Sequence, residues 1–273
     1  MLGTIIGDIA GSRFEFRNHK GKGFEIFHED CEFTDDSVMT LAIAKALIES
    51  KEDFEDLSEK TIFYMKEIGR PYRDCGYGGM FRRWIYSDAT EPYGSYGNGA
   101  AMRVSACGFV GQTTEEVKML ARKVTEVTHN HPEGLKGAEA TAVAIFLAKT
   151  GHTIPEIRAY IDENYYPMNF TLDEIRPTYA FDVTCQGSVP QAIMAFLEST
   201  SFEDAIRNAI SIGGDSDTIG AITGGIAEAY YGVPEEMREK AMEYLDERLR
   251  KVVVEFEGIH SLKNQKIQSI ISW

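Results

Sequence analysis

The chain has 273 residues, of which 43% are hydrophobic, and a formal net charge of −15. This acidic balance disfavours nonspecific binding to nucleic acid or anionic lipid, because phosphate contacts require clustered Lys and Arg. The four cysteines are too scattered for a zinc site, and Asp8 interrupts the only apolar run near the N-terminus. We therefore expect a cytoplasmic protein with reduced thiols and no membrane segment.

Helical patterns of apolar residues run along the whole chain. The first contains Gly3, Gly7 and Gly11, which form a stripe on one helical face that another backbone can approach closely. Many later segments begin with good N-cap residues, whereas alternating strand patterns are scarce. The sequence therefore predicts an all-α bundle, with further helices over residues 36–50, 53–69, 114–128, 133–150, 154–164, 188–199, 201–210, 215–231 and 235–256.

Two of the predicted helices are apolar nearly all round, which indicates that they lie at the centre of the bundle. Residues 38–48 and 138–148 are almost entirely apolar or Ala. No linker or change in composition divides the chain, so we predict a single domain over residues 1–273. The tail, residues 258–273, has too little pattern for an assignment.

Two clusters of oxygen-bearing side chains are the most informative segments, at residues 34–37 and 215–218. The first reads Thr-Asp-Asp-Ser, and the second reads Asp-Ser-Asp-Thr directly after two glycines. Each precedes a predicted helix, so its oxygens would lie in the first helical turn. Ordinary N-capping explains one such cluster. Two clusters with more acid than a cap needs favour a site for a hard cation.

The donor atoms narrow the choice to oxygen-liking cations such as Mg²⁺, Mn²⁺ or Ca²⁺. An EF-hand that starts at Asp215 fails, because Ile219 and Ile226 stand where oxygen ligands are needed. Together the clusters offer enough oxygens for two ions that share a carboxylate, an arrangement that activates water. These oxygens belong to Thr34, Asp35, Asp36, Asp215, Asp217 and Thr218.

Asp8 and Glu15 are further carboxylates near the end of the first helix. Their spacing of seven residues places them on one helical face but about 10 Å apart along the axis. We therefore expect one of them, and not both, to reach the clusters. The alternative for Glu15 is a partly buried carboxylate paired with Arg13 or Arg17.

Glycine-rich loops provide candidate contacts for a phosphate-bearing ligand. Residues 94–103 are small and precede an expected helix, where backbone N–H groups can hold a phosphate without net positive charge. A second loop, residues 76–79, carries a tyrosine that can stack on a base. Each loop alone is weak evidence, because such runs form turns in most chains. A histidine at a helix C-terminus, such as His129, is more often structural than a ligand contact.

Five sequence blocks, in this order, resemble the ADP-ribosylglycohydrolase family, which includes the dinitrogenase reductase activating glycohydrolases and the protein-ADP-ribose hydrolases. Any one block is common, whereas five in order are highly specific. They run from residue 7 to residue 218 and cover most of the chain. The blocks are residues 7–12 with Glu15, residues 33–37, residues 94–99 with Met102 and Arg103, residues 128–129 and residues 213–218.

This resemblance implies an all-α orthogonal bundle with a dinuclear Mg²⁺ or Mn²⁺ centre at the base of a cleft for ADP-ribose. By position, Glu15 lies beside the metals, and the implied metal ligands are Thr34, Asp35, Asp36, Asp215, Asp217 and Thr218. The residues that match substrate contacts of the family are Gly78, Gly94, Ser95, Tyr96, Gly97, Asn98 and His129.

We therefore predict a metal-dependent hydrolase that cleaves the bond at the anomeric carbon of the distal ribose. Glu15 or Asp36 would take a proton from the attacking water or stabilise the developing charge. The substrate would be an ADP-ribosylated protein side chain or a small ADP-ribose derivative. Two alternatives remain open: a non-catalytic ADP-ribose-binding or structural member of the fold, and a dinuclear-metal nucleotide phosphodiesterase that releases AMP.

Overall fold

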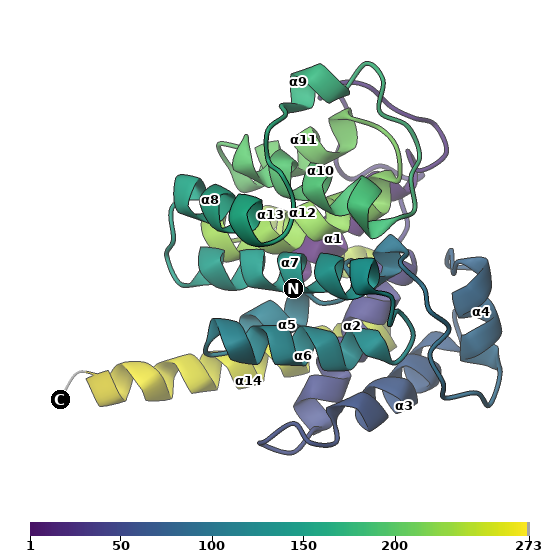
Figure 1. Cartoon of the computed structure of the whole chain (residues 1–273), viewed down its shortest axis with the longest axis vertical. Coiled ribbons are helices and arrows are strands. Elements are labelled where there is room, and N and C mark those ends of the chain that lie inside the picture. The colour runs from purple at the N-terminus through teal and green to yellow at the C-terminus, as the bar shows by residue number, and fades with distance from the viewer. Residues whose placement is uncertain (272–273) are drawn as a thin grey trace.

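The computed structural model describes the backbone of residues 1–271 and the side chains of residues 1–259. Within this range every regular element is a helix, and the predicted all-α class is confirmed (Figure 1). An isolated antiparallel bridge pairs Gly97 with Thr184. The elements are α1 Leu2–Ser12, α2 Asp35–Glu49, α3 Leu57–Gly69, α4 Gly79–Tyr86, the 3₁₀ turn η1 Asn98–Ala100, α5 Ser105–Val110, α6 Thr114–Glu126, α7 Pro132–Lys149, α8 Ile154–Asn164, α9 Leu172–Ile175, α10 Cys185–Leu197, α11 Phe202–Ser211, α12 Ser216–Tyr231, α13 Glu235–Tyr244 and α14 Glu247–Ile271.

Helices α1 and α12 pack against each other backbone to backbone at the centre of the molecule. A Cβ atom on Gly7 would lie 1.9 Å from the carbonyl oxygen of Gly220, and one on Gly3 would lie 2.2 Å from that of Gly224. Only residues without a side chain permit so close an approach. The glycine stripe is thereby confirmed as a surface of close backbone contact, and α7, α10 and α11 pack around the resulting pair.

Helices α2 and α7 are buried nearly all round, as their apolar sequences predict. Residues 38–44 of α2 and residues 140–148 of α7 are all buried. Both helices begin with a side-chain cap: the Thr34 hydroxyl accepts a hydrogen bond from the N–H of Asp36, and the His131 ring accepts one from the N–H of Glu133. Strong caps and a fully apolar interior together explain why these helices were predictable.

The structure departs from the predicted elements where helices are short or interrupted. Helices α4 and α9 have only 8 and 4 residues, too few to show an apolar period. The predicted helix over residues 235–256 is divided into α13 and α14, because Asp246 caps a new helix by accepting a hydrogen bond from the N–H of Leu249 at 3.0 Å. Helix α14 then continues to Ile271 and includes most of the tail left unassigned.

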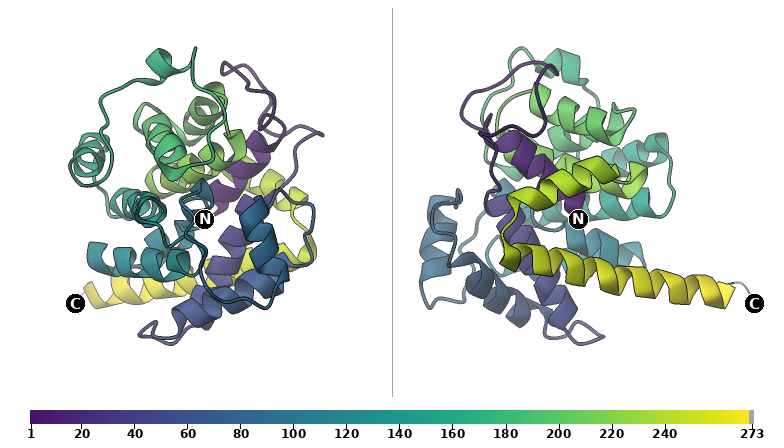
Figure 2. Two further views of the ribbon diagram at one scale, coloured as in Figure 1. Left: turned by 45° about the vertical axis from the view of Figure 1, so that its right-hand side comes forward. Right: turned by 180° about the vertical axis from the view of Figure 1, so that it is seen from behind.

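The views in Figure 2 show α14 crossing α2 and extending past the rest of the molecule. Helix α14 packs against α2. Among the helices that the structure describes, none has the length and apolar character needed to cross a membrane. The cavity described below is positioned by α1, α2 and α12, together with the loops between them.

The glycine contact between α1 and α12 gives a direct test of the fold. The Gly7→Ala substitution places a Cβ where Gly220 already lies, so we expect it to lower the free energy of unfolding by at least about 2 kcal/mol. Chemical unfolding measures this loss. Gly23→Ala is the matched control, because its Cβ would meet no atom within 4 Å. Equal stabilities of the two variants would contradict a backbone contact at Gly7.

Candidate active site

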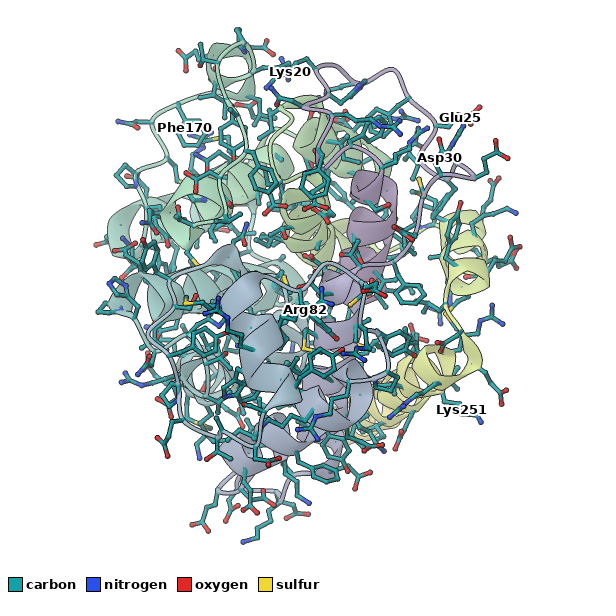
Figure 3. All side chains as sticks on the ribbon, turned by 90° about the vertical axis from the view of Figure 1, so that its right-hand side faces the viewer. Lys20, Glu25, Asp30, Arg82, Phe170 and Lys251 are labelled. Carbon is teal, nitrogen blue, oxygen red and sulfur yellow. The ribbon has the colours of Figure 1, made fainter. Side chains whose placement is uncertain are left out.

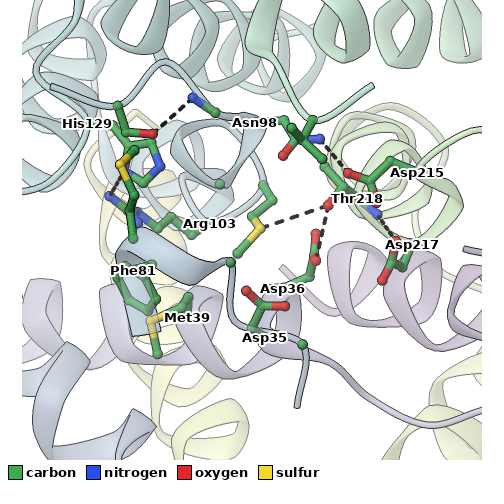
Figure 4. Close-up of a pocket in the computed structure, with 18 of the residues that line it drawn as sticks. Asp35, Asp36, Met39, Phe81, Asn98, Arg103, His129, Asp215, Asp217 and Thr218 are labelled. Atoms are coloured by element: carbon green, nitrogen blue, oxygen red, sulfur yellow. Dashed lines mark hydrogen bonds between the residues drawn. The ribbon is translucent and has the colours of Figure 1, made fainter. Parts of the chain in front are cut away.

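The N-terminal ends of α2 and α12 face a common cavity of about 410 Å³. Figure 4 shows acidic side chains from both helices on one side of this cavity and Arg103 and His129 on the other. The structure thus brings together residues that are up to about two hundred positions apart in the chain. The predicted site residues that line the cavity are Glu15, Asp35, Asp36, Gly78, Ser95, Gly97, Asn98, His129, Asp215, Asp217 and Thr218.

Asp8 fixes the first turn of α2 from the neighbouring helix α1. Its carboxylate accepts hydrogen bonds from the backbone N–H groups of Thr34 at 2.9 Å and Ser37 at 3.0 Å. The Thr34 hydroxyl donates to the second Asp8 oxygen at 2.7 Å, and the Ser37 hydroxyl also donates to Asp8. A carboxylate is favourable here because the N-terminus of a helix carries partial positive charge. Asp8 therefore holds the first acidic cluster in place.

The first turn of α12 presents the second cluster and bonds to the first. The Thr218 hydroxyl donates to Asp36 at 3.2 Å, which joins α12 to α2, and the N–H of Thr218 donates to Asp217 at 2.9 Å. Asp215 accepts a hydrogen bond of 2.6 Å from the side-chain amide of Asn98. The second cluster is thus tied both to α2 and to the glycine-rich loop.

The carboxylates form two groups whose oxygens are close enough to bind cations. One group consists of Asp8, Asp36 and Asp217, with one oxygen of each within 4.8 Å of the others. The other consists of Glu15, Asp215 and Asp217, at the same spacing. Asp36 also has a buried oxygen, Oδ1, with no hydrogen-bond partner among the described residues. An orphaned buried carboxylate oxygen among all-oxygen donors fits Mg²⁺ or Mn²⁺.

Glu15 lies beside the clusters because α1 ends before it. The helix stops at Ser12, and the chain then turns, so Glu15 does not continue the helical face of Asp8. We expected only one of the two carboxylates to reach the clusters, because a continuous helix would hold them apart. This expectation was wrong, since both Asp8 and Glu15 lie beside the clusters. The guanidinium of Arg13 donates instead to the carbonyl oxygen of Glu25 at 2.6 Å, so it does not neutralise Glu15.

Crowding and burial make these carboxyl groups weak acids. Burial raises the pKa of Asp8 to about 6, even though its four hydrogen bonds act in the opposite direction. Burial also raises the pKa of Glu15 to about 7, and the nearby negative charges of Asp215 and Asp8 add to the effect. The same two causes, burial first and neighbouring carboxylates second, place the pKa well above the usual range for Asp35, Asp36 and Asp217.

The glycine-rich loop enters the cavity through Ser95, Gly97 and Asn98. The N–H of Gly97 donates to the Ser95 hydroxyl at 3.1 Å, and the N–H of Asn98 donates to the carbonyl oxygen of Val183 at 2.7 Å. The helix that we expected to follow begins with a single 3₁₀ turn, η1, and α5 starts only at Ser105. Several N–H groups of this loop are therefore already paired within the protein.

Three predicted site residues lie near the cavity without lining it. Thr34 caps α2 and is not among the residues that line the cavity. The N–H of Gly94 donates to the side chain of Asn130 at 2.8 Å. Tyr96 is 46% exposed, and its ring lies 5.0 Å from that of His131. Their predicted roles remain predictions.

Several lining residues have no predicted role. Phe81 lies on the unpredicted helix α4, and Phe181 and Val183 lie in the loop before α10, where no motif marks them. Arg103 belongs to the glycine-rich block that resembles the family, yet a lone arginine in a sequence gives no sign of burial. Its exposed fraction in the structure is 1%.

Comparison with known proteins identifies the family of this chain. A sequence profile of the ADP-ribosylglycohydrolase family matches residues 1–265. The chain belongs to the ADP-ribosylglycohydrolase family. The prediction of an enzyme of the ADP-ribosylglycohydrolase class is confirmed by this match and by curated relatives that carry this activity in their names.

The similarity to individual ADP-ribosylglycohydrolase relatives is low in identity but extends over most of each chain. Human ADP-ribosylhydrolase ARH3 is 26% identical, over 89% of this chain and 88% of its own. The ADP-ribosyl-[dinitrogen reductase] glycohydrolase of Rhodospirillum rubrum is 27% identical, over 85% and 84%. A solved structure titled ADP-ribosylglycohydrolase-related protein complex has a TM-score of 0.61 at 23% identity, covering 89% of this chain and 94% of that one, which confirms the fold.

The raised pKa values predict how stability depends on pH. Asp8 and Glu15 hold protons more tightly in the folded state than at their usual values of 3.8 and 4.5. The contribution of these two groups to folding stability is therefore greatest below about pH 4, and this contribution is lost as the pH rises through about 7. For metal-free protein we expect the thermal midpoint to fall by on the order of 5 °C between about pH 5 and pH 7.5.

Divalent cations should reverse this loss, because they offset the repulsion between ionised carboxylates. We expect millimolar Mg²⁺ or Mn²⁺ to raise the midpoint more at the higher pH than at the lower one. The Asp217→Asn variant has one crowded carboxylate fewer and should show a smaller fall and a smaller cation effect. A midpoint of metal-free protein that rises with pH over this range would contradict the proposed crowding.

Proposed function

We propose that the protein is a metal-dependent hydrolase that releases ADP-ribose by cleaving the N- or O-glycosidic bond at the anomeric carbon of the distal ribose. Its substrates would be ADP-ribosylated protein side chains or small ADP-ribose derivatives. The observation that carries this proposal is the position of Asp217, which belongs to both carboxylate groups beside the cavity. A carboxylate common to two groups is the donor that a pair of divalent ions shares.

The acidic residues divide between the two proposed cation positions. Asp36 and Asp217 would hold one ion, and Asp215 and Asp217 the other. The remaining implied donors, Thr34, Asp35 and Thr218, would complete the two sets. When bound, Mg²⁺ or Mn²⁺ supplies Lewis-acid chemistry and lowers the pKa of a water molecule. The remaining work of the reaction belongs to side chains of this protein.

The glycine-rich loop would hold the diphosphate and the distal ribose. Ser95 and Asn98 supply polar side chains to the cavity, and Gly97 leaves room between them. The hydrogen bond from Asn98 to Asp215 fixes this loop relative to the acidic clusters. A substrate held by the loop would therefore have its distal ribose in a defined place next to the carboxylates, which is the condition for efficient attack. Gly78, Gly94 and Tyr96 would add contacts around it.

Glu15 is suited to accept the proton of the attacking water. Its half-buried carboxyl lines the cavity, and burial raises its pKa to about 7. A general base works best when its pKa lies near the working pH. Asp36, which carries the orphaned oxygen, would stabilise positive charge that develops on the sugar. The water oxygen would bond to the anomeric carbon as the bond to the acceptor breaks, and the proton taken up by Glu15 would pass to the departing acceptor atom. The products are free ADP-ribose and the unmodified acceptor.

The names of the curated relatives do not agree on one acceptor. One is an ADP-ribosylarginine hydrolase of Pseudomonas putida, 26% identical over 88% of this chain. Another acts on dinitrogen reductase. We therefore state the substrate class at the level of the ADP-ribosyl bond. All four cysteines are free thiols in the structure, which supports our proposal that the protein works in the cytoplasm.

Removal of the shared carboxylate tests the proposed function. We expect Asp217→Asn to lower the hydrolysis of ADP-ribosylated protein by about a thousandfold or more, because it weakens both cation positions. Far-ultraviolet circular dichroism should stay the same. Asp173→Asn, at a side chain that is 89% exposed and does not line the cavity, is the matched control and should retain the wild-type rate. Release of ADP-ribose is measured chromatographically with and without EDTA.

Each alternative function predicts a different result in this assay. Release of AMP in place of ADP-ribose would indicate attack at phosphorus and a phosphodiesterase. Binding of ADP-ribose without any turnover would indicate a non-catalytic member of the fold. Full hydrolysis after complete removal of divalent cations would rule out the metal-dependent reaction.

A further inference from the structure

Arg103 is a buried cation that has no counter-ion among the described residues. It ranks first by volume among the fully buried side chains, and it lines the cavity. Among the described residues no carboxylate forms an ion pair with it; Tyr93, Cys185 and then Asp35 act to raise its pKa against the larger effect of burial. Burial lowers that pKa to about 10, so the guanidinium remains charged at neutral pH. A buried charge left unpaired is strongly unfavourable, which points to a partner that the chain itself does not supply.

The guanidinium has hydrogen-bond donors to spare. Its Nη2 donates to the Thr128 hydroxyl at 2.6 Å and lies 3.5 Å from Nδ1 of His129. Its Nε is buried with no partner, and no described residue accepts a hydrogen bond from Nη1. The ring of Phe81, 5.9 Å away, provides a cation–π contact and no acceptor. An arginine can donate five such hydrogen bonds, so most of its capacity is free.

The same network sets the state of His129. Burial, and then the charge of Arg103, hold the pKa of His129 well below its usual value, so the ring is neutral. The Thr128 hydroxyl accepts from Arg103 and can therefore donate its own proton to Nδ1 of His129, 2.8 Å away. This assignment leaves a hydrogen on Nε2. A Cβ on Gly99 would lie 3.3 Å from that nitrogen, so the donor faces the glycine-rich loop.

The loop itself has few donors left for an anion. The N–H groups of Gly94, Gly97 and Asn98 already donate to Asn130, Ser95 and Val183. Among the described residues that line the cavity, Arg103 alone carries a positive charge at neutral pH. It lies across the cavity from the carboxylates of α12, where an anion is least repelled (Figure 4).

We infer that Arg103, together with the Nε2–H of His129, adds charge-assisted hydrogen bonds to the diphosphate of ADP-ribose that the glycine-rich loop would hold. The inference deepens the proposed function and rests on it, because the proposed ligand is the anion. The ligand would complete the ion pair that the folded chain leaves open, and charge-assisted hydrogen bonds to phosphate are stronger than neutral ones. Arg103 would thereby supply the positive potential that a strongly acidic protein otherwise lacks.

The test is calorimetric titration of ADP-ribose into wild-type protein and Arg103→Gln, each with Mg²⁺. Glutamine removes the charge but keeps a donor for Thr128. We expect the Kd to rise about 10- to 100-fold. The thermal midpoint of the ligand-free variant should stay within a few degrees of wild type or rise, because an uncompensated buried charge is gone. A purely structural arginine would instead lower the midpoint and leave the Kd unchanged.

Arg82→Gln is the matched control, because this arginine on α4 is 50% exposed and does not line the cavity. It should leave the Kd within about twofold of wild type. If Arg103→Gln does not fold, Arg103→Met replaces it, with the same expected Kd. A folded Arg103 variant with the wild-type Kd, or an equal loss in the Arg82 control, would overturn the inference. Failure of the wild-type protein to bind ADP-ribose would instead contradict the proposed function.

Discussion

The site depends on one helix, α1, which contacts the two helices that carry the acidic clusters. Its glycine face lies directly against α12, and its buried Asp8 accepts four hydrogen bonds from the first turn of α2. Because the chain leaves α1 just after Ser12, Glu15 reaches the same place. Displacing α1 would therefore move both acidic clusters and Glu15 at once. Figure 3 shows α1 among these helices with the side chains drawn.

Electrostatics divides the cavity into two walls. On one wall, carboxyl groups from the starts of α2 and α12 repel one another and ionise only with difficulty. On the other wall, Arg103 is charged and buried, and no carboxylate among the described residues forms an ion pair with it. Without a ligand, the like charges on the acidic wall and the unpaired charge of Arg103 each destabilise the folded protein. The acidic wall is complementary in charge to divalent cations, and Arg103 is complementary to the phosphates of a diphosphate substrate. Divalent cations would relieve the first wall and phosphate oxygens the second, so both binding events would stabilise the folded state.

Sequence reasoning predicts the parts of this structure that are set locally. Helices α2 and α7 each have a strong cap and a long apolar interior, and the acidic clusters at the starts of α2 and α12 follow from residue type. The end of α1 at Ser12 could not be predicted, because no breaker follows it, and so the joint approach of Asp8 and Glu15 was missed. The burial of Arg103 depends on packing between distant segments, which no local pattern records. The family resemblance, and not the residue pattern, supplied the expected ligand.

The central claim is that the two acidic clusters form one site for a pair of divalent cations that share Asp217. Anomalous diffraction from crystals of the protein grown with Mn²⁺ and ADP-ribose tests it most directly. We predict two anomalous peaks between the first turns of α2 and α12, both within bonding distance of Asp217, with the distal ribose beside them. No peak between these turns, or a single ion that does not contact Asp217, would contradict the account.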